Sequence, residues 1–315
     1  MRGAEPELSA AENFLRFARS EVAGKSPLYA ALCEGVAGDA ELLAFLESRP
    51  PRERQPNLLL AAVRVLFGLQ TKYAAFRAAV LEHRDEVAAV LATRRTQTNE
   101  PGRCAPLLPL LAALPQPLAL LEVGASAGLC LLPDRYAYDY AGHRVGDAAV
   151  VFPCRPEGAV PLPSQLPQVA WRAGIDLAPV DLADPDAVAW LEALVWPEET
   201  DRLERLRAAI AIARRDPPRI VTGDLVELLP ELAAEAPRDA TLVVFHTAVL
   251  AYLALERREE LGRRAAAAGA TWIACEAPGV LPALGDSAPG FAIGVDGRRV
   301  ATCDSHGRWL RWGGA

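Results

Sequence analysis

Hydrophobic positions divide the chain into a helical first third and a mixed remainder. Up to residue 115, apolar residues recur three or four positions apart, and no strand-like alternation occurs. The predicted helices are Glu12–Val22, a helix beginning at Ser26-Pro27, Ala40–Glu47, Asn57–Leu69, Tyr73–Ala92 and Cys104–Leu114. We therefore expect an all-helical amino-terminal domain, residues 1–103, that forms a lid over the rest of the chain.

After residue 117, short apolar runs alternate with helical segments. The predicted strands are Leu118–Val123, Val169–Leu177, Arg219–Thr222, Thr241–Phe245 and Thr271–Cys275. The predicted helices are Pro185–Val195, Asp201–Arg214, Val226–Ala234 and Glu256–Ala268. This alternation predicts an α/β domain over residues 104–315, with a Rossmann-like parallel sheet covered by helices. Its runs lack polar alternation because parallel strands are buried on both faces.

The end of the chain and an internal segment depart from this pattern. Phe291–Val295 and Arg298–Cys303 flank Asp296-Gly297, which predicts a carboxyl-terminal antiparallel hairpin with a two-residue turn. Residues 134–167 are interpreted as an insertion, because the first two predicted strands lie far apart. Within it, alternating tyrosines (Tyr136, Tyr138, Tyr140) indicate a strand, and Pro153–Pro167 indicates a loop.

A glycine turn follows the first predicted strand. Glu122 precedes Gly124 by two positions, Gly128 follows four later, and an apolar helix is expected next. Backbone N–H groups at such a helix start face a polar ligand. Glu122 would repel a pyrophosphate, so the turn favours a ligand with an ammonium group or a ribose.

The same turn also has the Gly-x-Ser-x-Gly spacing of a hydrolase nucleophile elbow, with Ser126 at its centre. Asp224 and His246 follow in the chain order of a Ser-Asp-His triad. Against an esterase, no strand is predicted before the elbow and no oxyanion segment of the His-Gly-Gly kind precedes it.

From the glycine turn onward, the chain resembles the class I S-adenosylmethionine-dependent methyltransferase fold. The resemblance implies that Asp176, after the second strand, binds ribose hydroxyls, with Asp139 or Asp181 as competitors. Asp224 and Leu225, in a Gly-Asp…Leu-Leu-Pro segment, would lie near the adenine. The implied cofactor is S-adenosylmethionine, and its methionine part would be held by the turn, namely Glu122, Gly124, Ala125, Ser126 and Gly128.

The chain also resembles a bacterial family known as domain of unknown function 2332. The matching stretches cover nearly the whole chain and include SPLYAALCEGVAGD, PNLLLAAVRVLF, RRTQTNEPGRCAPLLP, LLEVGASAGLCLLPDRYAYDY, TGDLVELLPEL, LVVFHTAVLAYL and SHGRWLRW. This resemblance implies a methyltransferase-like fold without a known reaction. Cys130 stands where the family usually has Asn, and the stretch around Gln70–Tyr73 is shortened.

Further polar residues are candidates for the substrate side. The run from Arg94 to Arg103 contains more hydrogen-bonding side chains than a helix cap needs. Thr98, Asn99 and Arg103 are therefore candidate substrate-binding residues, and Arg103 is suited to a carboxylate. Thr98 or Asn99 as a helix cap, with the arginines on a solvated face, is the alternative.

Candidates also follow the fourth and fifth strands and the hairpin. Glu276 would line the substrate pocket or cap the next segment. His246, after the fourth strand, is the candidate general base or a histidine bound to a loop carbonyl. His306 would face the same crevice as a second catalytic candidate or anchor the hairpin.

Composition narrows the function classes. The net charge of −7 argues against a nucleic-acid partner. No apolar run suits a membrane span and the amino terminus does not resemble a secretory signal. The six cysteines form no CxxC pair, and we expect no metal site. These observations predict a cytoplasmic protein with a small-molecule substrate, possible as a homodimer.

The hypothesis is methyl transfer from S-adenosylmethionine to a small-molecule oxygen or nitrogen nucleophile. One alternative is a non-catalytic protein that binds S-adenosylmethionine or a nucleoside. Another is a non-methylating enzyme on the same fold, because a fold does not fix a function.

Overall fold

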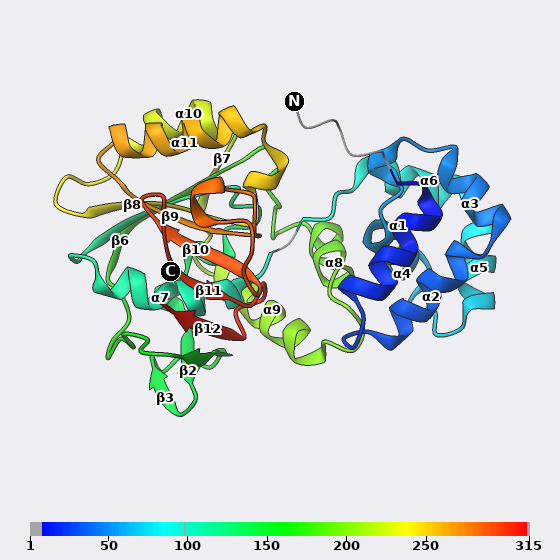
Figure 1. The fold of residues 1–315 in the computed structure, drawn as a ribbon, viewed down its shortest axis with the longest axis horizontal. Coiled ribbons are helices and arrows are strands. Elements are labelled where there is room, and N and C mark those ends of the chain that lie inside the picture. The colour runs from blue at the N-terminus through cyan, green and yellow to red at the C-terminus, as the bar shows by residue number, and fades with distance from the viewer. Residues whose placement is uncertain (1–7, 98, 314–315) are drawn as a thin grey trace. The chain divides into compact units, whose positions relative to one another are not determined.

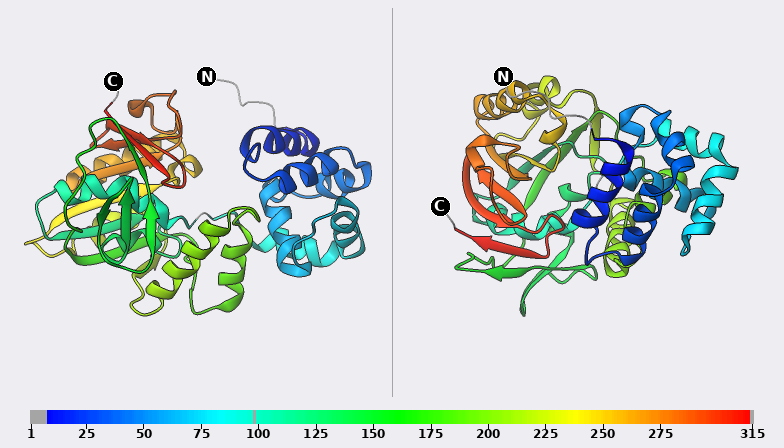
Figure 2. Two further views of the ribbon diagram at one scale, coloured as in Figure 1. Left: turned by 90° about the horizontal axis from the view of Figure 1, so that it is seen from below. Right: turned by 45° about the vertical axis from the view of Figure 1, so that its right-hand side comes forward.

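The computed structural model describes residues 8–97 and 99–313, which form two compact units. The first comprises Met1–Thr98 with Asp184–Glu204, and the second comprises Asn99–Ala183 with Arg205–Ala315 (Figures 1 and 2). This division differs from the predicted boundary after residue 103 in two ways. Residues 99–103 belong to the second unit, and 184–204 belong to the first.

The first unit is helical. Its elements are α1 (Ala10–Arg16), η1 (Phe17–Glu21), α2 (Pro27–Ala37), α3 (Ala40–Glu47), η2 (Pro51–Glu53), α4 (Pro56–Phe67), α5 (Tyr73–Glu82), α6 (Arg84–Thr93), α8 (Pro185–Ala193) and the beginning of α9 (Thr200–Ala213). Local sequence sets several helix starts. Ser26 accepts a hydrogen bond from the N–H of Tyr29, and Pro27 is the first residue of α2.

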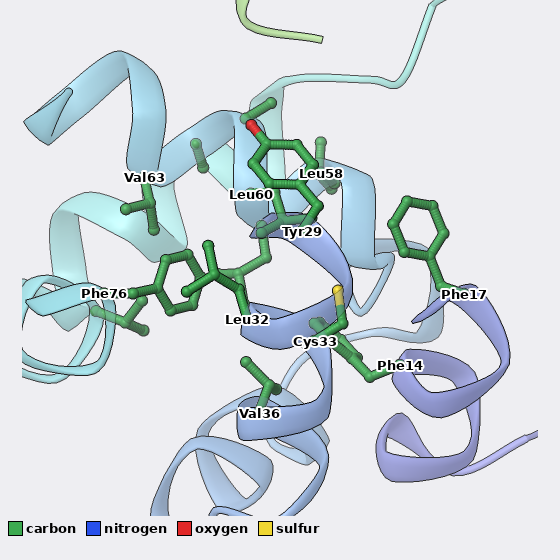
Figure 3. Packing of buried hydrophobic residues seen from close by; sticks show 14 of the residues in the cluster. Phe14, Phe17, Tyr29, Leu32, Cys33, Val36, Leu58, Leu60, Val63 and Phe76 are labelled. Atoms are coloured by element: carbon green, nitrogen blue, oxygen red, sulfur yellow. The ribbon is translucent and has the colours of Figure 1, made fainter. Parts of the chain in front are cut away.

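The buried apolar side chains of these helices form one core. Tyr29 and Leu32 of α2 pack in it with Phe76 of α5 (Figure 3). Trp190 of α8 belongs to the same core and donates an indole N–H to the carbonyl of Arg95, at 2.8 Å. Residues 184–204 therefore belong to this unit because the apolar face of α8 is buried there.

The single helix predicted over Tyr73–Ala92 is wrong. The structure has two helices, α5 and α6, which meet at His83 with φ −122° and ψ 40°. The ring of His83 packs against Phe67, with 4.7 Å between centroids. Apolar periodicity runs through the break, so the sequence pattern did not reveal it.

The second unit is a mixed α/β unit around a large, mostly parallel sheet. The strand order is β5-β12-β11-β10-β9-β8-β1-β6-β7. The parallel block is β1 (Leu118–Val123), β6 (Val169–Asp176), β7 (Arg219–Thr222), β8 (Thr241–Thr247) and β9 (Thr271–Glu276). The chain runs outward from β1 through β6 to β7, and then returns to the other side of β1 for β8 and β9.

Antiparallel strands extend this block. They are β10 (Phe291–Val295), β11 (Arg298–Cys303) and β12 (Trp309–Trp312), and β5 (Arg155–Glu157) pairs with β12 at the edge. The predicted hairpin is confirmed, with Asp296 at φ 49° and Gly297 at φ 77° in its turn. The sequence analysis did not predict β12.

Helices cover the sheet. α10 (Leu225–Ala233) and α11 (Leu255–Ala267) lie together on one face of the sheet (Figure 1). Their buried residues Leu229 and Leu261 belong to the same hydrophobic cluster as apolar residues of the strands. α7 (Cys104–Ala113) lies on the other side. The remaining short helices are η3 (Pro101–Arg103), η4 (Leu129–Leu131), η5 (Pro133–Arg135), η6 (Leu250–Tyr252) and η7 (Pro282–Leu284).

The inserted segment forms a small sheet of its own. β2 (Ala137–Tyr140) pairs with β3 (His143–Val145) and with β4 (Val151–Pro153), which confirms the strand predicted from the three tyrosines. The phenol of Tyr140 donates to the carbonyl of Ala105 at 2.6 Å, which attaches this sheet to α7. The loop prediction for Pro153–Pro167 is wrong over β5, because an edge strand accommodates Pro156 without a ladder N–H.

No α-helix follows the glycine turn, contrary to the prediction. Gly128 has φ 70°, and only the short helices η4 and η5 follow before β2. Pro133 begins η5 and would interrupt any longer helix, since it lacks an N–H and clashes with the preceding turn. The predicted helix amino terminus facing a ligand is therefore not present.

Candidate functional site

The glycine turn is a strained, closely packed loop at the carboxyl end of β1. Gly124 has φ 75° and Ser126 has φ 51°, a left-handed conformation that is unfavourable for serine. A Cβ on Gly124 would lie 2.4 Å from Cγ2 of Val249, so the residue after β1 must lack a side chain.

The backbone donors of the turn already have partners within the protein. The N–H of Ser126 donates to Oδ2 of Asp176 at 2.7 Å, and the N–H of Ala127 donates to Oδ1 of Asn99 at 2.8 Å. The Asn99 amide also donates to the Ser126 hydroxyl at 2.7 Å. The turn is therefore not an open cradle for phosphate, and the groups left for a ligand are carboxylate acceptors.

Glu122 is the most unusual of these acceptors. The residue is 3% exposed, and among the described residues its Oε2 has no hydrogen-bond partner. Burial raises the pKa of Glu122 well above its ordinary value of 4.5, and the charges of Cys130 and Asp176 add to this, whereas Arg103 opposes it. An unpartnered buried carboxyl is unfavourable in a folded protein, which makes Glu122 a candidate ligand-binding group.

Asp176 and Asp224 lie at the ends of the next two strands. Asp176 ends β6 and accepts N–H groups from Ser126 and, at 2.8 Å, from Ala178. Each carboxylate oxygen can accept a second hydrogen bond, so Asp176 retains acceptor capacity. The next residue, Leu177, is 69% exposed, which places an apolar surface beside the carboxylate.

Asp224 follows β7 and caps α10. Its Oδ1 accepts the N–H groups of Val226 and Glu227, at 2.9 and 3.0 Å, and pairs with Arg257. Partial burial opposes ionisation, but these backbone hydrogen bonds and the nearby arginine lower the pKa of Asp224. Leu225, the first residue of α10, is buried beside it.

The segment before α7 forms a second polar cluster. The guanidinium of Arg103 donates to the carbonyls of Ser305 and Thr247, at 2.8 and 3.2 Å. Oε2 of Glu100 lies 3.2 Å from Nδ1 of His306, and the thiol of Cys130 donates to the Glu100 carbonyl at 3.4 Å. The segment around η3, η4, the end of β8 and the turn between β11 and β12 are thereby held together.

His306 lies between β11 and β12 rather than after the last strand. Its side chain is 16% exposed, and no described residue forms a hydrogen bond with its Nε2. Glu100 was not a predicted site residue, although it stands in the polar run that drew attention. Only its pairing with His306, 206 positions later, reveals its role.

His246 and Glu276 form a buried pair. Their side chains are 0% and 1% exposed, and Nδ1 lies 2.7 Å from Oε1. The same oxygen accepts the N–H groups of Val249 and Leu250, at 3.0 and 3.1 Å. Glu276 therefore anchors the turn after β8, which carries Val249 against Gly124.

This geometry also bears on the esterase alternative. A triad needs a histidine hydrogen-bonded to the serine. The Ser126 hydroxyl instead accepts from Asn99, while His246 pairs with Glu276 and Asp224 pairs with Arg257. The three residues of the spacing-based triad do not form hydrogen bonds with one another. Thr98, a candidate substrate-binding residue, lies outside the described residues.

The chain was compared with known protein families. The family described as "Uncharacterized protein conserved in bacteria (DUF2332)" matches residues 11–312. The chain belongs to the DUF2332 family. Comparison with curated proteins and with solved structures finds no match.

Two further properties of this DUF2332 member come from the structure. Within residues 8–97 and 99–313, no helix is long and apolar enough to cross a membrane. Over the same residues, no three His, Cys, Asp or Glu side chains are grouped so that they could hold a metal ion.

Proposed function

We propose that this DUF2332 protein binds S-adenosylmethionine at the carboxyl edge of its parallel sheet and transfers the methyl group to a small molecule. The observation that carries the proposal is a row of acidic residues, Glu122, Asp176 and Asp224, at the ends of β1, β6 and β7. In the order β7-β6-β1-β8-β9, the chain adds β6 and β7 on one side of β1 and then β8 and β9 on the other side. Ligands of doubly wound sheets bind outside the carboxyl ends of the strands at such a reversal.

The remaining hydrogen-bonding capacity matches a ligand that carries donors. The N–H groups of the glycine turn have partners, whereas the three carboxyl groups can still accept hydrogen bonds. S-adenosylmethionine carries an ammonium group, two ribose hydroxyls and an adenine amino group, all of which donate. A dinucleotide would instead bring a pyrophosphate, which needs donors, to a turn whose backbone N–H groups already have partners.

The residues therefore fit this cofactor in the following way. Glu122 would hold the ammonium group, Asp176 the ribose hydroxyls and Asp224 the adenine amino group. Leu177 would cover the nucleoside with an apolar surface. When bound, the cofactor supplies an electrophilic methyl group on a sulfonium. A class I methyltransferase-like fold is part of this proposal, supported by the order of the parallel strands.

Of the two candidate bases, His306 suits the role better than His246. A general base needs a nitrogen within reach of the substrate proton. His246 is fully enclosed and is assigned a positioning role through Glu276 and Val249. With Nδ1 of His306 donating to Glu100, Nε2 carries the lone pair that would remove a proton from the methyl acceptor.

Titration calorimetry with S-adenosylmethionine and S-adenosylhomocysteine tests the binding. We expect saturable heat from the wild type, and an affinity at least about tenfold weaker in Asp176→Asn, because a carboxylate acceptor is lost. Asp239→Asn is the matched control, since Asp239 is exposed and precedes β8 at the opposite end of the sheet. No heat at millimolar cofactor, with protein shown to be folded by circular dichroism, would exclude the proposal.

Label transfer from tritiated S-adenosylmethionine to a small-molecule extract tests the reaction. His306→Ala should lose transfer while it retains S-adenosylhomocysteine binding. Equal transfer by this variant and the wild type would remove His306 as the base. Cofactor binding without any transfer would leave the non-catalytic binding protein as the better description.

A further inference from the structure

Arg103 is a buried cation whose hydrogen-bond acceptors among the described residues are all neutral. The residue is 4% exposed, and its guanidinium lies over the ring of Phe291, at 5.4 Å from the centroid. Its Nε donates to the carbonyl of Ser305, and Nη1 donates to the carbonyl and hydroxyl oxygens of Thr247. All these acceptors are neutral, and no described Asp or Glu forms an ion pair with Arg103.

Arg172 shows how this protein satisfies a comparable arginine. Its side chain is 14% exposed, and Asp134 binds it at two oxygens, at 2.8 and 2.9 Å, with the carbonyl of Leu131 as a further acceptor. That guanidinium is neutralised within the chain. The charge of Arg103 acts on the buried Glu122 at a distance, but no hydrogen bond or ion pair joins these two described residues. A buried charge is stabilised best by a hydrogen-bonded partner of opposite charge, so the contrast between the two arginines points to an anion that Arg103 binds.

The free donors of Arg103 have a defined direction. A guanidinium has five N–H groups, and the contacts with Ser305 and Thr247 leave the N–H groups of Nη2 without an acceptor among the described residues. The two N–H groups of Nη2 therefore remain to donate charge-assisted hydrogen bonds to an anion. The Phe291 ring and the contacts with Ser305 and Thr247 fix the plane of the guanidinium.

Position assigns the anion to the methyl acceptor rather than to the nucleoside. Asp176 and Asp224 lie at the ends of β6 and β7, on one side of β1. Arg103 contacts Thr247 at the end of β8 and Ser305 after β11, on the other side of β1. His306 follows Ser305 directly, so the proton acceptor and the cation belong to the same turn.

We infer that Arg103 binds a carboxylate of the methyl acceptor, and that the substrate is therefore a small organic acid. This inference rests on the proposed function. A monoanion suits the surroundings better than a phosphate, because Glu100 lies 3.2 Å from His306 in the same turn and would repel a second negative charge.

The test compares acids with their neutral amides. Acetate and acetamide, benzoate and benzamide, and succinate and succinamide are titrated calorimetrically at equal ionic strength, with S-adenosylhomocysteine present. We expect at least one acid to bind at least about tenfold more tightly than its amide. Arg103→Lys should abolish this preference, since lysine keeps the charge but lacks the planar pair of donors. Arg172→Lys is the matched control and should retain it.

Any one of the following three results overturns the inference. Equal binding of acids and amides by the wild type removes the carboxylate site, and this measurement does not depend on a variant that folds. An acid preference that survives Arg103→Lys assigns the anion to another residue. If Arg103→Lys weakens S-adenosylhomocysteine but not 5′-methylthioadenosine, which lacks the amino-acid part, the carboxylate is the cofactor's.

The outcomes also separate this inference from the proposed function. Acid binding that depends on Arg103, without any binding of S-adenosylhomocysteine, would exclude the cofactor and retain the anion site. Cofactor binding without a preference for acids over amides would retain the cofactor site and exclude the anion site.

Discussion

At the scale of single residues, the raised pKa of Glu122 predicts how the stability of the protein depends on pH. Its folded-state pKa is raised above its ordinary value of 4.5, mainly by burial. The unfolded chain therefore releases this proton at a lower pH than the folded protein does. Stability contributed by the protonated form is complete below pH 4.5 and is lost as the pH rises toward the folded-state pKa.

Glu122→Gln removes this dependence, because the amide does not ionise. We expect urea denaturation to show the variant gaining stability relative to the wild type above pH 4.5, by up to about 1.4 kcal/mol per pH unit. Glu231→Gln, at an exposed position of α10, is the matched control for the change from Glu to Gln. A pH-independent difference for Glu122→Gln would mean that Glu122 ionises normally in the folded protein.

The second prediction at this scale concerns the contribution of the ion pair between Asp134 and Arg172 to stability. Both side chains are mostly buried, and Asp134→Ala would leave the guanidinium without its counter-charge. We expect a loss of about 3 kcal/mol in the free energy of unfolding. Glu235→Ala breaks the exposed pair with Arg219 and should cost less than about 1 kcal/mol. Similar losses in the free energy of unfolding would show that the buried Asp134–Arg172 pair stabilises the protein no more than the exposed pair does.

At the scale of elements, the glycine turn and the turn after β8 are coupled by contact. Gly124→Ala meets Val249 at 2.4 Å and also forces alanine to adopt φ 75°. Gly269→Ala, at φ 70° with no atom within 4 Å of the added Cβ, isolates the backbone part, about 1–2 kcal/mol. Gly124→Ala should therefore be clearly more destabilising in thermal and urea unfolding.

A double-mutant cycle measures the contact directly. Val249→Gly removes every Val249 atom that the added methyl group would meet. The double variant should be about 1–2 kcal/mol more stable than the sum of the single changes predicts. Strict additivity would show that the two turns do not restrain each other.

Elements were the level at which the sequence was most informative. Long apolar runs such as Leu118–Val123 are buried on both faces, and their pattern is clear. The sequence failed where a backbone break interrupts a continuous pattern, as at His83, and where pairing depends on a distant partner. β5 is a strand only because β12 lies beside it, and nothing within Arg155–Glu157 indicates this.

The candidate site, too, could be predicted from the sequence only in part. Residue type and position after a strand were enough to select Glu122, Asp176 and Asp224, because the ends of parallel strands meet at one edge. Hydrogen-bond partners were not predictable. The pairing of His246 with Glu276 links two candidates that had separate expected roles, and it exists because their strands are neighbours with side chains on the same face.

At the scale of the whole molecule, the two units are not consecutive in sequence. The chain leaves the helical unit after Thr98, returns for Asp184–Glu204 and leaves again within α9. The stability of the amino-terminal helices therefore depends on side chains nearly a hundred positions later. Trp190 is the clearest example, because it is 4% exposed in the core of the first unit and packs there with α4.

Hydrogen exchange followed by mass spectrometry tests this dependence in the full chain. Trp190→Ala removes a large buried side chain and its hydrogen bond to Arg95, which should cost about 3–5 kcal/mol. Because exchange reports local stability, we expect faster exchange in α2 and α4, with β1 unchanged. Leu229→Ala, in α10 of the second unit, should instead speed exchange in β1 and leave exchange in α2 and α4 unchanged. Faster exchange confined to α8 and α9 in Trp190→Ala would mean that residues 184–204 are only attached to the helical unit and do not stabilise it.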